Sequence, residues 1–342
     1  MMRVLQPRQL LRTAAQTAVS AALVALLLWR GDLDQAVHVA RDADYFYLPL
    51  AFPAYLLANL LVAVRWRIAL PRTRQPPLMD LYAIFLTGML VNRLLPMRLG
   101  DVLRVQVLAR RFGLRRAGLT ALIFITETLL DGLAFVFLFL ATLAFLGLPQ
   151  LPLTLVWALS IAVLTGLLMA TAAARLELAE GWQDRGWFRH LPEIVRRPVS
   201  GWVPEFLEGL AVLKDASLAG RAVAATFAAW LLHAAVFYLF GQAFGLDLSL
   251  AQALIVTITA ALVVSVPLAP FNLGTYEVGV AGVLVLMGAS NAEAVAYALG
   301  SHVFTVAFAA LAGFPAMWAI GLGIHDLPFF GRPEAGENAG GS

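Results

Sequence analysis

Basic, acidic and amide side chains crowd together where one hydrophobic stretch of the chain is interrupted. The candidate residues lie within thirteen positions and are Asn92, Arg93, Pro96, Arg98, Gly100, Asp101 and Arg104. On a helix, Arg98, Asp101 and Arg104 would share one face, because positions three apart are neighbours. Arginine binds phosphate through two parallel hydrogen bonds. The pattern predicts a basic groove for an anionic group; the alternative is an amphipathic helix at the lipid headgroups, with Asp101 as its cap.

The motif Pro-x-x-Leu-Gly of this first interruption, residues 96–100, returns in a second interruption at residues 270–274. The candidate residues here are Pro270, Asn272, Gly274, Tyr276 and Glu277. The glycine permits a turn, and Thr275 would cap a half-helix whose exposed N–H groups favour anions. Broken hydrophobic segments at matching places in two halves of a chain indicate a transporter-type site. The alternative is a kinked helix with Glu277 at the outer interface.

Two carboxylates stand one helical turn apart in an otherwise apolar stretch. Glu127 and Asp131 are spaced i and i+4, so they share a helix face and repel each other if both are charged. A charge inside a bilayer costs about 2.5 kcal/mol or more. We expect the pair to bind Arg93, Arg98 or Arg104, or to carry a proton during transport. A purely structural salt bridge is the alternative.

The composition places these residues in a membrane. Of 342 residues, 61% are hydrophobic and only 13% are charged, which is typical of an integral membrane protein. The net charge of +3 does not indicate a nucleic-acid partner, because the basic residues flank apolar spans. The chain has no cysteine and no P-loop, dinucleotide, zinc or nucleophile motif. We therefore predict no metal, no cofactor and no catalytic residue.

Six apolar segments are each long enough to cross about 30 Å of hydrocarbon. They are residues 10–29, 45–64, 119–145, 153–174, 222–244 and 294–322. Two shorter segments, residues 78–95 and 250–266, end at the interruptions. Tryptophans near the span ends are typical of interfacial anchors: Trp29, Trp66, Trp230 and Trp318. The sequence predicts an all-α, polytopic transmembrane helical bundle.

The distribution of arginines orients the spans. The N-terminal arginines and those that follow the second span, from Arg65 to Arg74, mark the cytoplasmic side, whereas the acidic loop 31–44 suits the outside. The loops can be assigned consistently to the two sides of the membrane only if both interrupted segments are re-entrant hairpins. Each half then has three crossings and opposite topology, which makes an inverted repeat. The alternative is eight or more full crossings.

These features define one membrane domain. It covers residues 1–322, with pseudo-repeats at 10–148 and 151–322 and a cytoplasmic polar loop at 175–218. Residues 323–342, rich in Gly, Pro and Glu, are predicted to be a disordered cytoplasmic tail. We expect a multi-pass protein of the cell (inner or plasma) membrane with both termini in the cytoplasm.

The order of the motifs resembles one known family. The run from Asn92 to Arg104, then Glu127 with Asp131, then the run from Pro267 to Glu277, is similar to the lysylphosphatidylglycerol synthase transmembrane-region family, also called flippase-like. The resemblance covers about residues 10–322 and implies a polytopic inner-membrane protein; the best-understood members move a lipid between leaflets. Thr128 departs from the family pattern, which often has arginine there. The family's synthase activity belongs to a separate soluble domain and is not expected here.

The leading hypothesis is a non-enzymatic lipid translocase for an anionic phospholipid or lipid-linked substrate. Arg98 and Arg104 would hold the phosphate, and Glu127, Asp131 and Glu277 would balance its charge and couple to protons. Membrane lipids are the expected partners, with a second copy of the chain or a lipid-modifying enzyme as further candidates. The alternatives are a membrane enzyme acting on a lipid-linked substrate and an accessory subunit of a separate synthase.

Overall fold

Helices make up every element that the computed structural model describes. The described residues are 18, 20–25, 32–70, 75–95, 98–146, 161, 164–172, 192–193, 206, 210–265 and 270–323. Four of these helices are long and apolar enough to cross a membrane: α3 (Tyr47–Ala69), a continuous helix over Arg116–Thr142, α11 (Ala216–Ala243) and α14 (Asn291–Ala319). Each overlaps a predicted span, and the all-helical membrane architecture is confirmed.

Several predictions fall on other parts of the chain. The predicted spans 10–29 and 153–174, the polar loop 175–218 and the tail 323–342 lie mostly outside the described residues. The domain and repeat boundaries therefore stay predictions.

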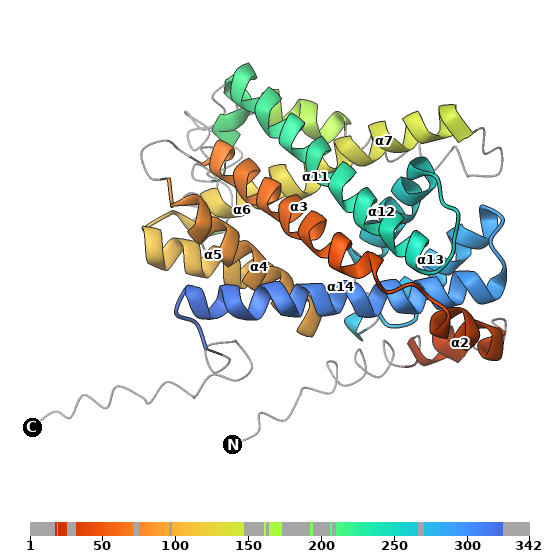
Figure 1. The fold of residues 1–342 in the computed structure, drawn as a ribbon. Helices are drawn as coiled ribbons and strands as arrows, with labels where there is room; N and C mark the ends of the chain where they lie inside the picture. The colour runs from red at the N-terminus through yellow and green to blue at the C-terminus, as the bar shows by residue number, and fades with distance from the viewer. Residues whose placement is uncertain are drawn as a thin grey trace, which may run out of the picture.

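The first interruption is the turn of a helical hairpin. Its arms are α4 (Leu78–Leu94) and α5 (Leu99–Phe112), which pack against each other (Figure 1). A Cβ atom on Gly100 would lie 1.9 Å from the carbonyl oxygen of Gly88, so the arms approach this closely only because residue 100 is glycine. The arms of 17 and 14 residues give about 26 and 21 Å of helix, short of a full crossing.

The second interruption forms a matching hairpin from α12 (Leu250–Ser265) and α13 (Thr275–Leu286), with a 3₁₀ turn over Pro270–Asn272 between them. Its arms of 16 and 12 residues give about 24 and 18 Å of helix. Arg98 and Asn272 hold the same place in the two Pro-x-x-Leu-Gly motifs, and both have left-handed backbone, with φ of 53° and 57°. The two turns thus share a backbone feature as well as a sequence.

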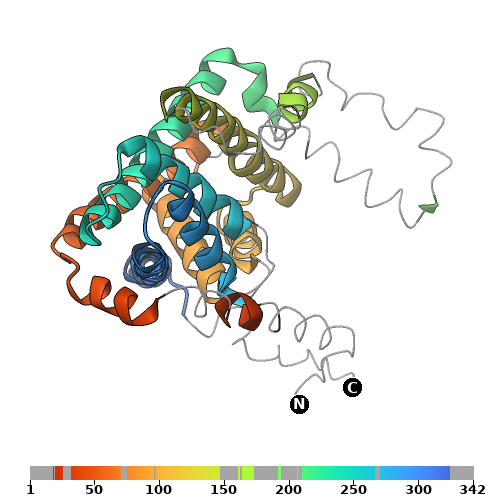
Figure 2. The same ribbon diagram turned by 90° about the vertical axis from the view of Figure 1, so that its right-hand side faces the viewer.

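The remaining helices join the two hairpins. α3 and α11 pack along each other in the middle of the molecule, and α14 runs beside α4, α13 and the short α2 (Leu33–Arg41) (Figure 1). In Figure 2, α14 is seen nearly along its axis. The Arg116–Leu146 helix consists of α6 (Arg116–Phe124), a π-helical turn (Ile125–Leu130) and α7 (Asp131–Leu146).

The packed pairs correspond when the helices of the two halves are matched in chain order. The contact of α3 with α4 matches that of α11 with α12, and the contact of α4 with α14 matches that of α12 with α7. This correspondence agrees with two structural repeats. The inverted orientation of the repeats and the re-entrant path of the hairpins stay predictions.

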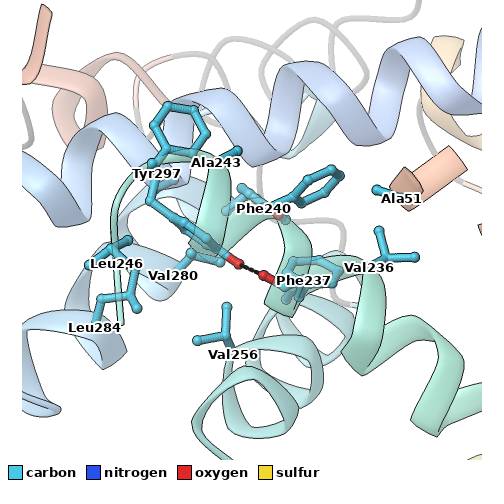
Figure 3. Close-up of a cluster of buried hydrophobic side chains, with 14 of the residues drawn as sticks. Ala51, Val236, Phe237, Phe240, Ala243, Leu246, Val256, Val280, Leu284 and Tyr297 are labelled. Carbon is cyan, nitrogen blue, oxygen red and sulfur yellow. Dashed lines mark hydrogen bonds between the residues drawn. The ribbon is translucent and has the colours of Figure 1, made fainter. Parts of the chain in front are cut away.

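The largest apolar cluster lies where α11 to α14 meet. Phe240, Val256, Val280 and Leu284 are buried there, and α3 contributes Ala51 (Figure 3). Within the cluster, the hydroxyl of Tyr297 donates to the carbonyl oxygen of Phe237 at 2.8 Å. This apolar packing holds the second hairpin against α11 and α14.

The tryptophans differ from their prediction as interfacial anchors. Trp66 is completely buried between α3 and α4, and the indole N–H of Trp230 donates to Asp131, so the prediction is wrong for both. Trp318 is 63% exposed, as an anchor requires, and Trp29 lies outside the described residues. Position near the end of an apolar run did not separate an anchor from an inward-facing residue.

Candidate functional site

A cavity of about 260 Å³ lies between the two hairpin turns. Leu95 and Arg98 line it from the first turn, and Phe271 and Asn272 line it from the second. The helices α3 and α11 and the Arg116–Leu146 helix complete much of its wall with Tyr55, Asn59, Arg65, Glu127, Asp131, Trp230 and His233. The structure thus brings two segments far apart in the sequence to one cavity, whose mostly apolar wall contains charged side chains.

The residues singled out from the sequence separate into two groups. Those that line the cavity are Asn92, Arg93, Arg98, Glu127, Asp131, Asn272 and Tyr276. Those that do not line it are Gly100, Asp101, Arg104, Gly274 and Glu277. Pro96 and the side chain of Pro270 lie outside the described residues. The residues of the second group all lie on the two hairpins, whereas the first group also includes Glu127 and Asp131 of the Arg116–Leu146 helix.

Arg104 is the internal cation of the first hairpin. Its side chain is 1% exposed, donates to Glu127 Oε1 at 2.7 Å and pairs with Asp101. The guanidinium also lies 5.4 Å from the ring centre of Trp66 and 4.8 Å from that of Phe85, both within cation–π range. Glu127 therefore has the arginine partner that we predicted, but Arg104 is enclosed and does not face the cavity.

Asn92 joins the two arms of the hairpin. Its amide donates to Asp101 Oδ1 at 2.9 Å, and its carbonyl accepts the backbone N–H of Gly100 at 2.8 Å. The alternative in which Asp101 caps the helix is wrong, because α5 has no side-chain cap and the Asp101 carboxylate instead binds Asn92, Arg104 and Arg98. Arg98 reaches Asp101 at 3.0 Å and stays 45% exposed.

Asp131 binds residues that the sequence reasoning did not place in the site. It forms an ion pair with Arg65 and accepts the indole N–H of Trp230 at 2.9 Å, while Arg65 also donates to the Thr226 hydroxyl at 3.1 Å. The predicted pairing of Asp131 with one of the arginines of the first interruption is wrong. The sequence pattern predicts Arg65 to be a cytoplasmic residue after the span, because hydropathy ends the span at Val64, whereas α3 continues to Ala69 and buries this arginine.

A π-helical turn sets the direction of the two carboxylates. Glu127 lies within the turn Ile125–Leu130, and Asp131 is the first residue of α7. Glu127 pairs with Arg104 of α5. Asp131 pairs with Arg65 of α3 and accepts a hydrogen bond from Trp230 of α11. Such turns inside α-helices are rare and recur at functional sites.

The second hairpin has its own buried polar group behind the cavity. The Glu277 carboxylate, 4% exposed, accepts the backbone N–H of Gly274 at 2.7 Å and lies 2.6 Å from Nδ1 of His302 on α14. Glu277 is therefore enclosed by protein, and its depth in the membrane stays a prediction. The expectation that Thr275 caps α13 is wrong, because its hydroxyl donates back to the Asn272 carbonyl at 3.0 Å.

Arg93 differs from the other cavity arginines. It lines the cavity, its Nη1 is buried without a hydrogen-bond partner, and no carboxylate within the described residues pairs with it. The arrangement as a whole can receive an anion at this guanidinium. Within the same part of the chain, no group of three or more His, Cys, Asp or Glu side chains could hold a metal ion.

Fold and site together define a multi-pass membrane protein with a charged internal cavity. The chain belongs to the lysylphosphatidylglycerol synthase TM region family, whose model matches residues 13–313, which confirms the resemblance seen in the motifs. It is also 25% identical over 336 residues to a UPF0104 membrane protein of Methanothermobacter thermautotrophicus, covering 92% of this chain and 93% of the relative. No solved structure matches the chain at a significant level.

Proposed function

We propose that this protein moves a lipid with an anionic headgroup, either a phospholipid or a lipid-linked substrate, between the leaflets of the membrane. The observation that carries the proposal is the cavity with charged side chains between the turns of two broken hairpins. A headgroup crossing hydrocarbon loses its water, and fixed charges inside the protein replace that hydration. Membership in a lipid synthase's membrane-region family supports a lipid substrate.

The same proposal includes the surroundings of the protein. We place it in the cell membrane with both termini in the cytoplasm, acting without chemical change to the lipid. A second copy of the chain, or a separate enzyme that modifies the lipid, is the partner we propose. The buried Glu277–His302 pair and the carboxylates Glu127 and Asp131 are the groups proposed to exchange protons during the cycle.

Transport in proteoliposomes tests the function. Purified protein is reconstituted with a trace of fluorescent phosphatidylglycerol or fluorescent polyprenyl phosphate, and dithionite added outside bleaches the outer leaflet. We expect protein-containing vesicles to lose well over half of the fluorescence, whereas empty vesicles lose about half. Wild-type protein that moves neither lipid would contradict the proposal.

A matched pair of variants shows whether the cavity is the route. Ala261→Trp places a large side chain on a residue that lines the cavity, and Leu262→Trp places the same side chain on the neighbouring residue, which is 41% exposed and does not line it. Ala261→Trp should stop transport and Leu262→Trp should preserve it. Equal transport by both variants would exclude this cavity as the route.

A further inference from the structure

The cavity contains one guanidinium whose charge nothing in the described protein balances. We propose that Arg93 is the anion receptor of this cavity and that it binds the singly charged phosphodiester of a lipid headgroup. The inference rests on the proposed function and deepens it, since it names the binding residue and the charge of its ligand. It also assigns phosphate binding to Arg93, whereas the sequence pattern assigned it to Arg98 and Arg104.

Arg93 has a side-chain nitrogen whose hydrogen-bonding capacity is unused. Nη1 is buried and has no hydrogen-bond partner. Buried polar atoms in proteins nearly always have partners, and those that lack one need an explanation such as a missing ligand. Because Arg93 lines the cavity, a ligand there is placed to bind it.

The other arginines that line the cavity have carboxylate partners. Arg65 is paired with Asp131, and Arg98 reaches both Asp101 at 3.0 Å and Glu127 at 4.0 Å. Three arginines and two carboxylates line the cavity, so among the described lining residues one positive charge is in excess. The nearby Glu277 does not line the cavity and is held by His302 and the Gly274 amide.

The charge and volume of the cavity indicate the class of anion. One excess cation matches one negative charge, which a phosphodiester carries, whereas a phosphomonoester carries about −1.5 to −2 at pH 7. The volume of about 260 Å³ lies just below the range of small-molecule sites, roughly 300–1,000 Å³, and so suits a headgroup rather than acyl chains. Neutral polar groups share the wall, from Tyr55, Asn272 and Tyr276. The Tyr55 hydroxyl and the Asn272 amide can bond the remaining phosphate or glycerol oxygens, whereas the Tyr276 hydroxyl is already hydrogen-bonded to Ser301 at 3.1 Å.

Native mass spectrometry of the purified full chain tests the assignment with phosphatidylglycerol as the probe. Arg93→Gln should weaken its binding by about tenfold to hundredfold, the loss expected for a hydrogen bond to a charged group. Arg93→Lys should retain part of the affinity, because it keeps the charge but not the fork. Arg110→Gln, which removes an exposed arginine of α5 outside the cavity, should bind like wild type. Unchanged binding by Arg93→Gln, or an equal loss in Arg110→Gln, would overturn the inference.

Competition distinguishes the source and charge of the phosphate. Phosphatidic acid, a monoester, and the soluble compounds glycerophosphoglycerol and inorganic phosphate are each added against bound phosphatidylglycerol. We expect phosphatidic acid and inorganic phosphate to compete poorly, and glycerophosphoglycerol, which has the same singly charged phosphodiester, to compete better than either. Strong competition by phosphatidic acid would refute the single-charge rule, and strong competition by inorganic phosphate would show a free-phosphate site rather than a lipid site.

The readouts keep the inference separate from the proposed function. If the wild-type protein moves lipid and Arg93→Gln binds phosphatidylglycerol as well as the wild type does, the inference is refuted and the proposed function stands. If Arg93→Gln loses binding but the wild-type protein moves no lipid, the proposed function is refuted and Arg93 stands as the anion receptor. If Arg93→Gln does not fold, the decision passes to Arg93→Lys, which must bind phosphatidylglycerol more weakly than wild type while melting at the same temperature.

Discussion

Asp131 is the residue at which three parts of the fold are tied together. It begins α7, pairs with Arg65 of α3 and accepts the indole N–H of Trp230 from α11. Removing one partner of a buried ion pair is far more damaging than removing both, because the survivor stays charged without compensation. The stability of the molecule should therefore depend on the pair being intact or wholly absent.

A double-mutant comparison tests this dependence. Asp131→Asn leaves the Arg65 cation unpaired and should lower stability by about 3–5 kcal/mol. The double variant Arg65→Met/Asp131→Asn should lose less, because no buried charge remains and the amide oxygen can still accept from Trp230. Melting temperatures from tryptophan fluorescence in detergent measure both. A double variant that melts below Asp131→Asn would show that the pair does not act in this way.

Glu277 allows a second residue-scale prediction. Its carboxylate accepts the Gly274 N–H and contacts His302, so Glu277→Leu leaves both groups unpaired, at about 1–3 kcal/mol each. Glu277→Gln should be milder, since its amide oxygen can still accept from Gly274. The melting temperature should fall in the order wild type, Glu277→Gln, Glu277→Leu, and an equal fall for both variants would contradict the assigned hydrogen bonds.

At the scale of elements, each hairpin depends on close packing and on an unusual turn. Arg98 and Phe271 adopt left-handed backbone although neither is glycine, and residues of this kind store about 1–3 kcal/mol of strain. Strain of this kind persists only where the surroundings hold it. Here the Asn92 bonds and the Gly88–Gly100 contact hold the first turn.

A glycine substitution tests the packing of the first hairpin. In Gly100→Ala the new methyl group would lie 1.9 Å from the Gly88 carbonyl oxygen, so α4 and α5 must move apart, at a loss of about 1–3 kcal/mol. Gly282→Ala is the matched control, because it lies in an arm of the second hairpin with no atom within 4 Å of the new methyl. Gly100→Ala should melt several degrees lower and Gly282→Ala should not.

The positions of the helices were more predictable from the sequence than the contacts between them. The apolar runs located α3, α11, α14 and both hairpins, because long hydrophobic stretches and Pro-Gly breaks are local properties of a chain. The Arg104–Glu127 pair was within reach, since both residues stood out as charges in apolar surroundings. The Arg65–Asp131 pair was not, because it depends on how far α3 continues past its apolar run, and on tertiary packing that no local pattern records.

At the scale of the whole molecule, the two hairpins meet at one cavity from opposite ends of the sequence. Their turns have the same motif, and their neighbouring helices pack in corresponding pairs. An inverted repeat would let the two halves exchange shapes, so that the cavity opens alternately to either side. That model requires the loops of corresponding elements to lie on opposite faces of the membrane.

Cysteine labelling tests that requirement, and the chain has no native cysteine to interfere. Asp42→Cys before α3 and Asn291→Cys at the start of α14 are both exposed and should react with a membrane-impermeant maleimide added to intact cells. Arg116→Cys, exposed at the start of α6, should react only after the membrane is permeabilised. The Arg116–Leu146 helix and α14 hold the same place in the two predicted repeats. Labelling of Arg116→Cys and Asn291→Cys from the same side of the membrane would therefore exclude the inverted repeat.

The π-helical turn at Ile125–Leu130 also has a consequence for how this chain can vary. Such a turn is an α-helix with one residue added, and each residue turns an α-helix by about 100°. Deleting one residue there would leave α6 in place and rotate all of α7 about its own axis, which would carry Asp131 away from Arg65. Related chains that lack the added residue must then tie α3 to α7 through a different side chain.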